Sequence, residues 1–373
     1  MLTRLYAHNY RCFINFELTP ARSGILLGYN GSGKSSVFDV LIGLVQLLHW
    51  NKDASDAFPG DTVTRFGDSA DQRFELDVTS AWGGMRYVLV VTHDLDQGTC
   101  RIASEEVTLD GKPLYRFKDA EVQLYRDDHT PARDTFSYTP KRSFLASLEA
   151  KPVNRRLTWF KNFIGGIWVL GLNPRRMAAV STADDDVLDV DGGNFASWCR
   201  HLLQDAPEHM EQATTALRQI MPGFQRLRMQ LAGRSRVLVA TFQVPGGKAY
   251  DLDFEALSDG QKVLIVLYAV LHAVGGSAAL LCLDEPDNFV SIREIQPFLI
   301  ELANLTEDQG VQTLLISHSG EVINFFGPEG ALLLERPEGG PTRVGRLSHE
   351  RALSLSELMA RGWHLPVEGG DAG

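Results

Sequence analysis

Hydrophobic and polar residues change their spacing along the chain, and each spacing predicts a type of element. Near the N-terminus strands are expected over residues 3–10 and 23–27, and apolar positions at helical spacing predict a helix over 34–48. Alternating segments at 73–79 and 85–92 flank a Gly-Gly turn, which predicts a hairpin of an antiparallel sheet. The first third of the chain should therefore hold an antiparallel sheet beside one buried helix.

The last third alternates helical and strand-like segments, the pattern of a mostly parallel sheet covered by helices. These segments are expected at 259–274, 279–284, 291–304, 311–316, 320–326 and 330–335. Before them, residues 140–220 are expected to be mostly helical around an Asp-rich loop at 183–191, and residues 223–254 return to strands. No internal repeat or sustained heptad is found, so a long coiled-coil arm is not expected.

These patterns predict a single α/β domain over residues 1–373. Its expected parts are a first lobe with the antiparallel sheet (1–135), an inserted helical and β lobe (136–256), a segment with the later motifs (257–345) and a C-terminal helix and tail (346–373).

One apolar stretch imitates a membrane span. Residues 263–283 carry no charge and are long enough to cross a bilayer. A Gly-Gly-Ser triplet at 275–277 interrupts them, however, and Asp284 and Glu285 follow at once. We interpret the stretch as a buried helix, a glycine turn and a buried strand, so no membrane association is expected.

Charge and cysteine content further narrow the classes of protein to which this chain can belong. The formal net charge of −11 makes the chain a poor candidate for a dedicated nucleic-acid coat, although a local basic stripe could still bind phosphates. The four cysteines stand far apart without a Cys-x-x-Cys pair, which favours neither a zinc cluster nor a disulfide framework. This usage suits the reducing cytoplasm.

Residues 28–35, Gly-Tyr-Asn-Gly-Ser-Gly-Lys-Ser, match the P-loop pattern GxxxxGK[ST] between an expected strand and an expected helix. Glycines let backbone N–H groups curl around a phosphate, and the start of a helix adds positive potential. Lys34 is expected to reach the β- and γ-phosphates of ATP, and the Ser35 hydroxyl to bind Mg²⁺. The expected nucleotide-binding residues here are Asn30, Gly31, Ser32, Gly33, Lys34, Ser35 and Ser36.

A second motif is the apolar strand over 280–284, which ends in Asp284 and Glu285. Acids at the carboxyl edge of a sheet lie where α/β proteins bind ligands. Beside a P-loop, Asp284 is expected to hold Mg²⁺ and Glu285 to orient or deprotonate the attacking water. Solvated acids at a strand end are the alternative.

Two weaker signals accompany these motifs. Residues 257–261, Leu-Ser-Asp-Gly-Gln, precede a helix, where Ser258 alone would be interpreted as an N-cap. His318 follows the strand expected at 311–316, where a lone histidine is usually structural. Their order around Asp284, however, is similar to that of the LSGGQ-type signature and switch histidine of ABC ATPases.

The chain resembles ABC-type ATPase heads of the RecF, SMC and OLD group, and especially the compact AAA ATPases of bacterial defence genes. The resemblance begins at Asn-Tyr-Arg-Cys-Phe (9–13), similar to the opening N-F-[RK]-x-F, and runs through Asp-Gly-Gly-Asn-Phe (191–195) to His318. It implies a P-loop NTPase fold with a mixed sheet, an antiparallel β subdomain and a helical signature lobe. Arg11, in the opening, is assigned to the nucleotide site by the same resemblance.

In that group two heads enclose two ATP molecules, and each P-loop faces the signature of the other subunit. The resemblance implies that Ser258 and Gly260 contact the γ-phosphate of a second copy, that Asp287 lies in a loop at the seam, and that His318 bonds the γ-phosphate. Gln72 is the candidate for a glutamine that binds the metal. A homodimer, ATP and Mg²⁺ are thus implied.

A basic segment offers a candidate contact surface. It mixes aromatic residues with Lys141, Arg142, Lys151, Arg155, Arg156, Lys161, Arg175 and Arg176. Such a mixture can bind nucleic acid, bind a partner protein, or form an ordinary amphipathic helix pair.

Two functions follow from the sequence. One is an ATP-driven switch for a separately encoded effector, for which we consider a nuclease, in antiphage defence. The other is a RecF-like DNA-binding clamp in repair. SMC-type arms are not expected, and the 55 residues after His318 are too few for an OLD-type C-terminal nuclease.

Overall fold

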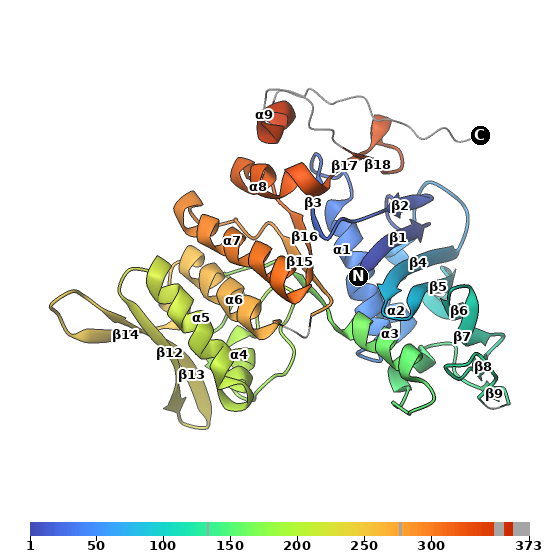
Figure 1. The fold of residues 1–373 in the computed structure, drawn as a ribbon, viewed down its shortest axis with the longest axis horizontal. Coiled ribbons are helices and arrows are strands. Elements are labelled where there is room, and N and C mark those ends of the chain that lie inside the picture. The colour runs from blue at the N-terminus through green and yellow to red at the C-terminus, as the bar shows by residue number, and fades with distance from the viewer. Residues whose placement is uncertain (133, 276–277, 347–353, 361–373) are drawn as a thin grey trace.

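The computed structural model describes residues 1–132, 134–275, 278–346 and 354–360. It is elongated, with an antiparallel sheet at one end, a parallel sheet in the middle and a helical lobe with a protruding β-ribbon at the other end (Figure 1). Of the expected C-terminal helix and tail, α9 (Leu355–Ala360) is helical. Residues 361–373 lie outside the described residues.

The central sheet has the strand order β10-β15-β16-β3-β17-β18, parallel except for β18. Its strands are β3 (Ser23–Leu27), β10 (Ile167–Leu170), β15 (Leu280–Asp284), β16 (Gln312–Ile316), β17 (Ala331–Glu335) and β18 (Arg343–Arg346). All but β18 are short, mainly apolar runs, because helices or the second sheet cover both faces. The mixed sheet expected from the sequence is confirmed.

One strand of this sheet corrects the sequence analysis. Residues 140–220 were expected to be mostly helical, but α3 (Arg155–Gly165), α4 (Phe195–Asp205) and α5 (Pro207–Ile220) hold 36 of these 81 residues. The apolar run of β10 lies among them and forms the edge strand beside β15. Four apolar residues have no distinguishable period, so only their pairing with β15 decides that they form a strand.

The antiparallel sheet has the order β2-β1-β4-β5-β6-β7-β8-β9. Its strands are β1 (Leu2–His8), β2 (Phe16–Leu18), β4 (Asp71–Ser80), β5 (Gly83–Asp94), β6 (Thr99–Leu109), β7 (Lys112–Lys118), β8 (Glu121–Leu124) and β9 (Phe136–Ser137). Buried and more exposed residues alternate along β5, because one sheet face packs on the core. The expected hairpin of β4 and β5 is confirmed.

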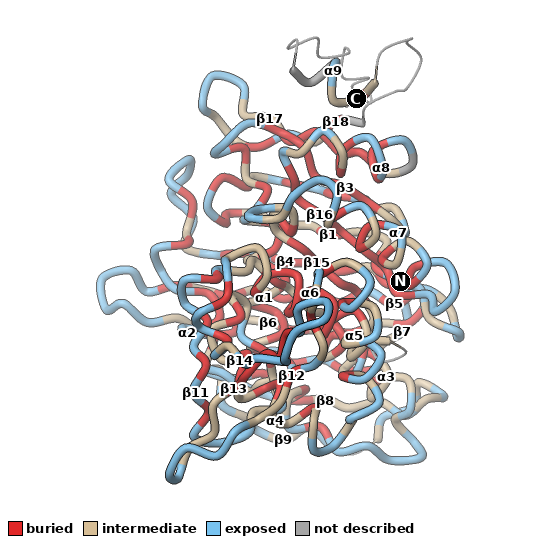
Figure 2. Tube along the Cα trace, turned by 90° about the vertical axis from the view of Figure 1, so that its left-hand side faces the viewer, coloured by how far each residue is buried: buried red, intermediate tan, exposed pale blue. Residues whose placement is uncertain are grey.

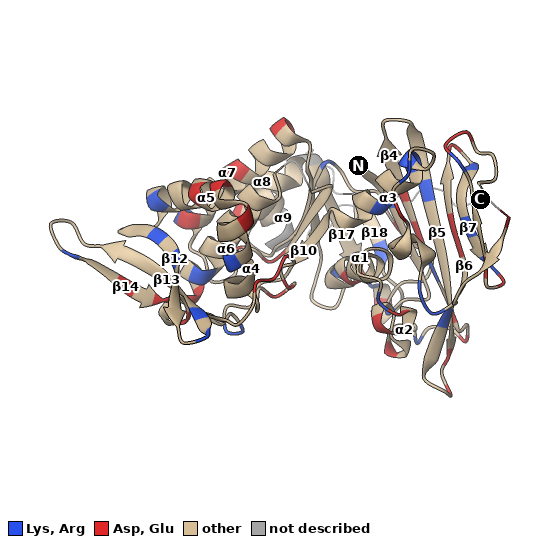
Figure 3. Ribbon diagram, turned by 90° about the horizontal axis from the view of Figure 1, so that it is seen from below, with Lys and Arg blue, Asp and Glu red and all other residues tan. Residues whose placement is uncertain are grey.

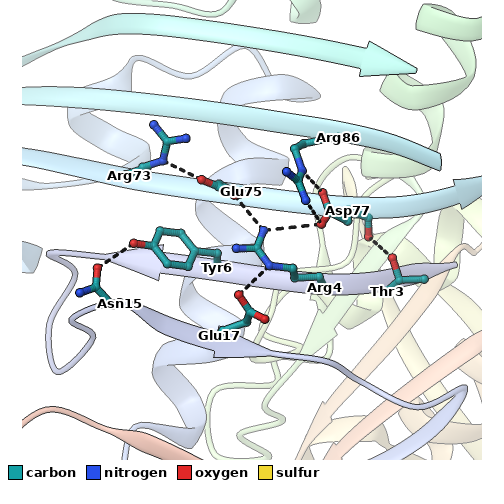
Figure 4. Close-up of polar contacts among 9 residues, drawn as sticks. All are labelled: Thr3, Arg4, Tyr6, Asn15, Glu17, Arg73, Glu75, Asp77 and Arg86. Carbon is teal, nitrogen blue, oxygen red and sulfur yellow. Dashed lines mark hydrogen bonds and ion pairs between the residues drawn. The ribbon is translucent and has the colours of Figure 1, made fainter. Parts of the chain in front are cut away.

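The outer face of this sheet carries a polar network that ties β1, β2, β4 and β5 together (Figure 4). The Arg4 guanidinium contacts Glu17 at 2.7 Å and Glu75 at 2.8 Å, on the strands either side of it. Arg86 meets Asp77 at 2.6 Å across the next strand pair. Such cross-strand pairs favour one strand register, since a shift by one residue would turn these charges toward the core.

Helix α1 (Lys34–Leu48) lies between the two sheets, and its bounds are those that the apolar spacing predicts. Val37, Leu41 and Leu44 are fully buried in a core shared with both sheets. Buried segments gather around β3, β16 and β1, while peripheral loops are exposed (Figure 2). Helix α1, which follows the P-loop, is therefore packed against a sheet on each side.

A second core joins the parallel sheet to the helical lobe. It contains residues of α6 (Asp259–Ala273), α7 (Ile292–Gln309), α8 (Gly320–Gly330), β12 (Phe224–Ala232) and β13 (Ser235–Gln243). The short strands β11 (Val180–Ser181) and β14 (Ala249–Asp253) pair with β13 and complete the ribbon. The apolar stretch 263–283 thus contributes to a helix and to strand β15 of this core. Within the described residues no helix is both long and apolar enough to cross a membrane.

Candidate nucleotide site

The glycine-rich turn between β3 and α1 has the backbone of a phosphate-binding loop. Gly28, Gly31 and Gly33 have φ angles of 145°, 79° and 101°. A Cβ on Gly28 would lie 2.3 Å from the Leu334 carbonyl oxygen, so glycine is required there. Gly33 is the N-cap of α1, with no side-chain cap and no acid in the first turn. The positive end of the helix dipole therefore stays available to an anion.

Lys34 and Ser35 point from the start of α1 toward this loop and toward β15. The Lys34 ammonium donates to the Gly28 carbonyl at 2.8 Å and to the Tyr29 carbonyl at 3.2 Å. Burial lowers its pKa, whereas the carboxylates of Glu285 and Asp284 act in the opposite direction. A buried ammonium held by two weak neutral acceptors is poised for a stronger anionic partner.

The Ser35 hydroxyl donates to the Asp284 carboxylate at 2.9 Å. Burial raises the pKa of Asp284, and the bond from Ser35 opposes this shift. A hydroxyl and a carboxylate at this separation fit the few protein ligands that Mg²⁺ takes when phosphates and waters complete its octahedron.

The side chain of Ser32 tests whether the loop at 28–35 suits a triphosphate. Its hydroxyl oxygen is buried and, among the described residues, has no hydrogen-bond partner. An orphaned buried hydroxyl is costly, and a phosphate oxygen in the loop would satisfy it. The residues present therefore fit a nucleotide with Mg²⁺.

Glu285 and His318 meet at the carboxyl ends of β15 and β16. The His318 Nε2 atom lies 3.7 Å from the Glu285 carboxylate, and both side chains remain partly exposed. Asn288 donates a short hydrogen bond to the other Glu285 oxygen. Glu285 has a left-handed backbone with φ of 49°, and its N–H bonds the Ile316 carbonyl at 2.8 Å. The loop after β15 thus holds this carboxylate over the sheet edge.

Asp287, two residues after Glu285, accepts a hydrogen bond from a residue of its own chain. The Ser317 hydroxyl donates to it at 2.7 Å, which links the loop after β15 to the end of β16. Burial raises the pKa of Asp287, and this bond opposes the rise.

A cavity of about 630 Å³ brings most of the predicted residues together. Its predicted lining residues are Arg11, Asn30, Gly31, Gly33, Lys34, Ser35, Ser36, Asp284, Glu285 and His318. The volume lies within the range of about 300–1,000 Å³ typical of ligand pockets. A second wall faces the turn at 28–35 across this cavity.

The second wall consists of residues that the sequence analysis missed. Asp61, Arg65 and Phe66 come from the loop before β4, and Arg336 follows β17 directly. The Arg336 guanidinium donates to the Gly31 carbonyl at 3.1 Å and lies 5.6 Å from the centre of the Phe66 ring. Arg336 could have been found from its place at a strand's carboxyl end. The loop around Phe66 carries no motif.

Arg11 also lines this cavity. Its guanidinium pairs with Asp39 of α1 and lies 5.6 Å from the centre of the Tyr10 ring. Its backbone has φ of 47°, and its N–H donates to the Thr62 carbonyl. The turn at 9–13 therefore anchors the loop that carries Asp61 and Phe66.

Ser258 and Gly260 do not line this cavity. Ser258 caps α6 in a capping box, accepting from the Gln261 N–H at 3.3 Å, while its own N–H donates to the Gln261 side chain at 3.0 Å. A Cβ on Gly260 would lie 2.5 Å from the Phe289 carbonyl oxygen, so the start of α6 packs closely on the loop after β15. Within one chain the signature segment is thus separate from the P-loop cavity.

The structure contradicts the prediction that Gln72 binds the metal. Gln72 is fully buried in β4 and does not line the cavity. Its amide nitrogen donates to the Asn9 carbonyl and the Thr62 hydroxyl, and its oxygen contacts His93 Nε2 at 2.9 Å. Because both amide groups are occupied in the core, Gln72 is a structural residue.

The basic segment is not a continuous patch. Lys161 donates to the carbonyls of Ala146 and Leu148, Arg142 pairs with Asp53, and Arg176 pairs with Asp191. Basic and acidic residues are interleaved over both lobes (Figure 3).

The fold and this site define a P-loop ATPase of the ABC and SMC head class. The SMC head bound to the C-terminal winged-helix domain of ScpA has a TM-score of 0.56 at 15% identity, with 94% of this chain and 99% of that chain covered. The Pyrococcus furiosus SMC head with an extended coiled coil, bound to the C-terminal domain of ScpA, has a TM-score of 0.50 at 12% identity, with 97% and 98% covered.

The family model described as "AAA domain, putative AbiEii toxin, Type IV TA system" matches residues 25–324, which span the P-loop, β15 and His318. The chain belongs to this family, as the resemblance to defence-type AAA ATPases implied. The search of curated proteins found no match.

Proposed function

We propose that this chain binds and hydrolyses ATP as a homodimeric switch for a separately encoded effector in antiphage defence. The observation that carries the proposal is the division of the site within one chain. The phosphate loop, the Ser35–Asp284 pair and Glu285 line one cavity, whereas the serine-capped start of α6 lies outside it. A second copy could supply that helix start to the open cavity.

In the proposed reaction each residue of the cavity has a role set by its position. Lys34 and the backbone N–H groups of the loop hold the β- and γ-phosphates. Glu285 orients and deprotonates the attacking water, and His318 donates to the γ-phosphate. Mg²⁺ held by Ser35 and Asp284 would neutralise negative charge on the phosphates.

The switch follows from the thermodynamic linkage between ATP binding and dimer formation. ATP that contacts both copies binds the dimer more tightly than the monomer, so it favours closure. Hydrolysis removes the bridging phosphate contact and so favours release. The effector would distinguish the two states; the SMC heads of similar fold, solved with ScpA domains bound, support a protein partner. A nuclease is our first hypothesis for it.

The family description, which names a toxin, supports a role in defence. The RecF-like alternative has less support, because acids or carbonyls engage Arg142, Arg176 and Lys161 of the basic segment.

The decisive experiment uses Glu285→Gln with Mg²⁺ and ATP. Removing the base while keeping its shape should halt hydrolysis and trap the closed state, so light scattering should show a doubling of mass. Glu307→Gln on the exposed part of α7 is the matched control and should behave as the wild type. A monomeric Glu285→Gln that binds ATP tightly would refute the switch.

A further inference from the structure

A second cavity, of about 220 Å³, lies at the other end of α1 from the P-loop. Ile42 and Trp50 line it from α1 and the residues just after it, Trp168 and Val169 from β10, and Leu188 from the loop before α4. Its walls are therefore the helix that begins at Lys34 and the strand paired with β15.

Size and chemistry restrict what fits this cavity. Small-molecule sites measure roughly 300–1,000 Å³, so this one is too small for a nucleotide-sized ligand. Its walls are mainly aliphatic and indole groups, and Ile42, Trp50, Trp168 and Val169 are all partly exposed. One large apolar side chain, entering from outside, fills such a space in the way that anchor residues fill pockets at protein interfaces.

The rim is acidic. The loop 183–191 holds five aspartates and no basic residue. Asp185 binds the Asn194 amide and Asp191 pairs with Arg176, but among the described residues Asp184, Asp186 and Asp189 form no ion pair. Asp186 itself lines the cavity.

Three cations lie near this rim, and Arg176, which pairs with Asp191, opposes the larger rise that burial causes in the pKa of Asp189. The Lys161 ammonium is held by two backbone carbonyls, at 2.7 and 3.0 Å. Burial lowers the pKa of His49, and Lys161 acts in the same direction, whereas Asp186 opposes them. A rim of unpaired carboxylates attracts a positively charged partner.

We infer that this cavity is a docking site for a partner-protein segment with one large apolar side chain between Lys or Arg residues. The side chain occupies the space between Trp50 and Trp168, and the cations pair with Asp184, Asp186 and Asp189. The inference rests on the proposed switch only in taking the partner to be the effector.

Calorimetric titration of the full chain without nucleotide tests the site. The probes are three capped pentapeptides, Lys-Lys-Phe-Lys-Lys, Lys-Lys-Ala-Lys-Lys and Glu-Glu-Phe-Glu-Glu. Burial of the Phe ring should make the first bind about tenfold or more tightly than the second. The acidic peptide should not bind, because the rim repels it. Equal binding of the Phe and Ala peptides would overturn the inference.

Two variants localise the binding. Ile42→Trp fills the cavity and should remove the preference for Phe over Ala, whereas Ile300→Trp on the exposed face of α7 should keep it. Replacing Asp184, Asp186 and Asp189 together by Asn should weaken both lysine peptides; the same change at Asp96, Asp119 and Asp308 should not. Unchanged binding in either cavity variant contradicts the site.

Benzyl alcohol is the remaining probe. If it binds as tightly as the Phe peptide, the cavity is a small-molecule site and the docking inference fails. None of these titrations contains ATP, so their failure leaves the dimer test of Glu285→Gln untouched, and failure of that test leaves the peptide results standing.

Discussion

At the scale of the residue, Lys34 is the side chain on which nucleotide binding should depend most. Its ammonium is buried 2.8 Å from the Gly28 carbonyl, where a phosphate would be a much stronger acceptor. Lys34→Ala should weaken ATP binding by about 100-fold or more. Titration with a fluorescent ATP analogue measures this, with the exposed Lys52→Ala as control. Unchanged affinity would refute the P-loop assignment.

A second residue, Glu105, gives the fold a pH dependence outside the site. Its carboxylate is buried and accepts hydrogen bonds from Tyr87, Tyr115 and Ser143 at 3.0, 2.8 and 2.6 Å. Burial raises its pKa to about 7, and the three hydroxyl groups oppose the rise. Because the folded protein holds this proton more tightly than the unfolded chain, the stabilisation is complete below the unfolded pKa and disappears as the pH rises toward 7.

The wild type should therefore lose about 3 kcal/mol of unfolding free energy at Glu105 between pH 4.5 and pH 7.5. Glu105→Gln should remove that part of the pH dependence, since Gln does not titrate. Urea unfolding at several pH values measures the difference. Glu106→Gln, at the partly exposed neighbouring residue whose carboxylate pairs with Arg116, serves as the control. Parallel pH profiles of wild type and Glu105→Gln would show that folding does not raise the pKa of Glu105.

At the scale of the element, α1 illustrates how packing overrides propensity. Glycine inside a helix costs about 1 kcal/mol relative to alanine, so the sequence alone suggests that Gly43→Ala is stabilising. A Cβ at Gly43, however, would lie 2.8 Å from the Ala57 carbonyl oxygen and 2.7 Å from the Phe58 ring. Helix α2 (Ala54–Ala57) therefore approaches α1 closely only because Gly43 has no side chain.

Gly43→Ala should accordingly destabilise the protein by about 1–3 kcal/mol through overpacking between α1 and α2. The urea midpoint should fall without a change in m-value. A midpoint at or above that of the wild type would show that α2 can move away freely.

At the scale of the whole molecule, the proposed sharing of the site between two copies predicts complementation between two inactive variants. Lys34→Ala disables the P-loop, and Ser258→Arg places a large cation at the start of α6 while leaving ATP binding to the monomer intact. Each alone should lack ATPase activity. In a mixed dimer one site combines both defects and the other combines two unaltered halves, so an equimolar mixture should recover about a quarter of wild-type turnover.

Phosphate release from the two variants, alone and mixed, measures this recovery. If each site were formed within one chain, mixing would restore nothing. Normal turnover by Ser258→Arg alone would also exclude a role for the signature segment in a second copy.

The sequence by itself determined those features that depend on neighbouring residues. The bounds of α1 followed from apolar spacing, the turn at 28–35 from its glycines, and the acids after β15 from the end of an apolar run. Each is a local pattern whose physical cause lies within a few residues. The parallel sheet also followed, since strands that alternate with helices have few other ways to bury their apolar faces.

Tertiary structure alone decided the rest. Ile167–Leu170 became a strand because β15 pairs with it, and Gln72 became structural because Asn9, Thr62 and His93 surround its amide. Phe66 and Arg336 lie 270 residues apart and meet at the cavity only through folding. Contacts between distant segments leave no local period or spacing in the sequence, so they can be identified only once the chain is folded.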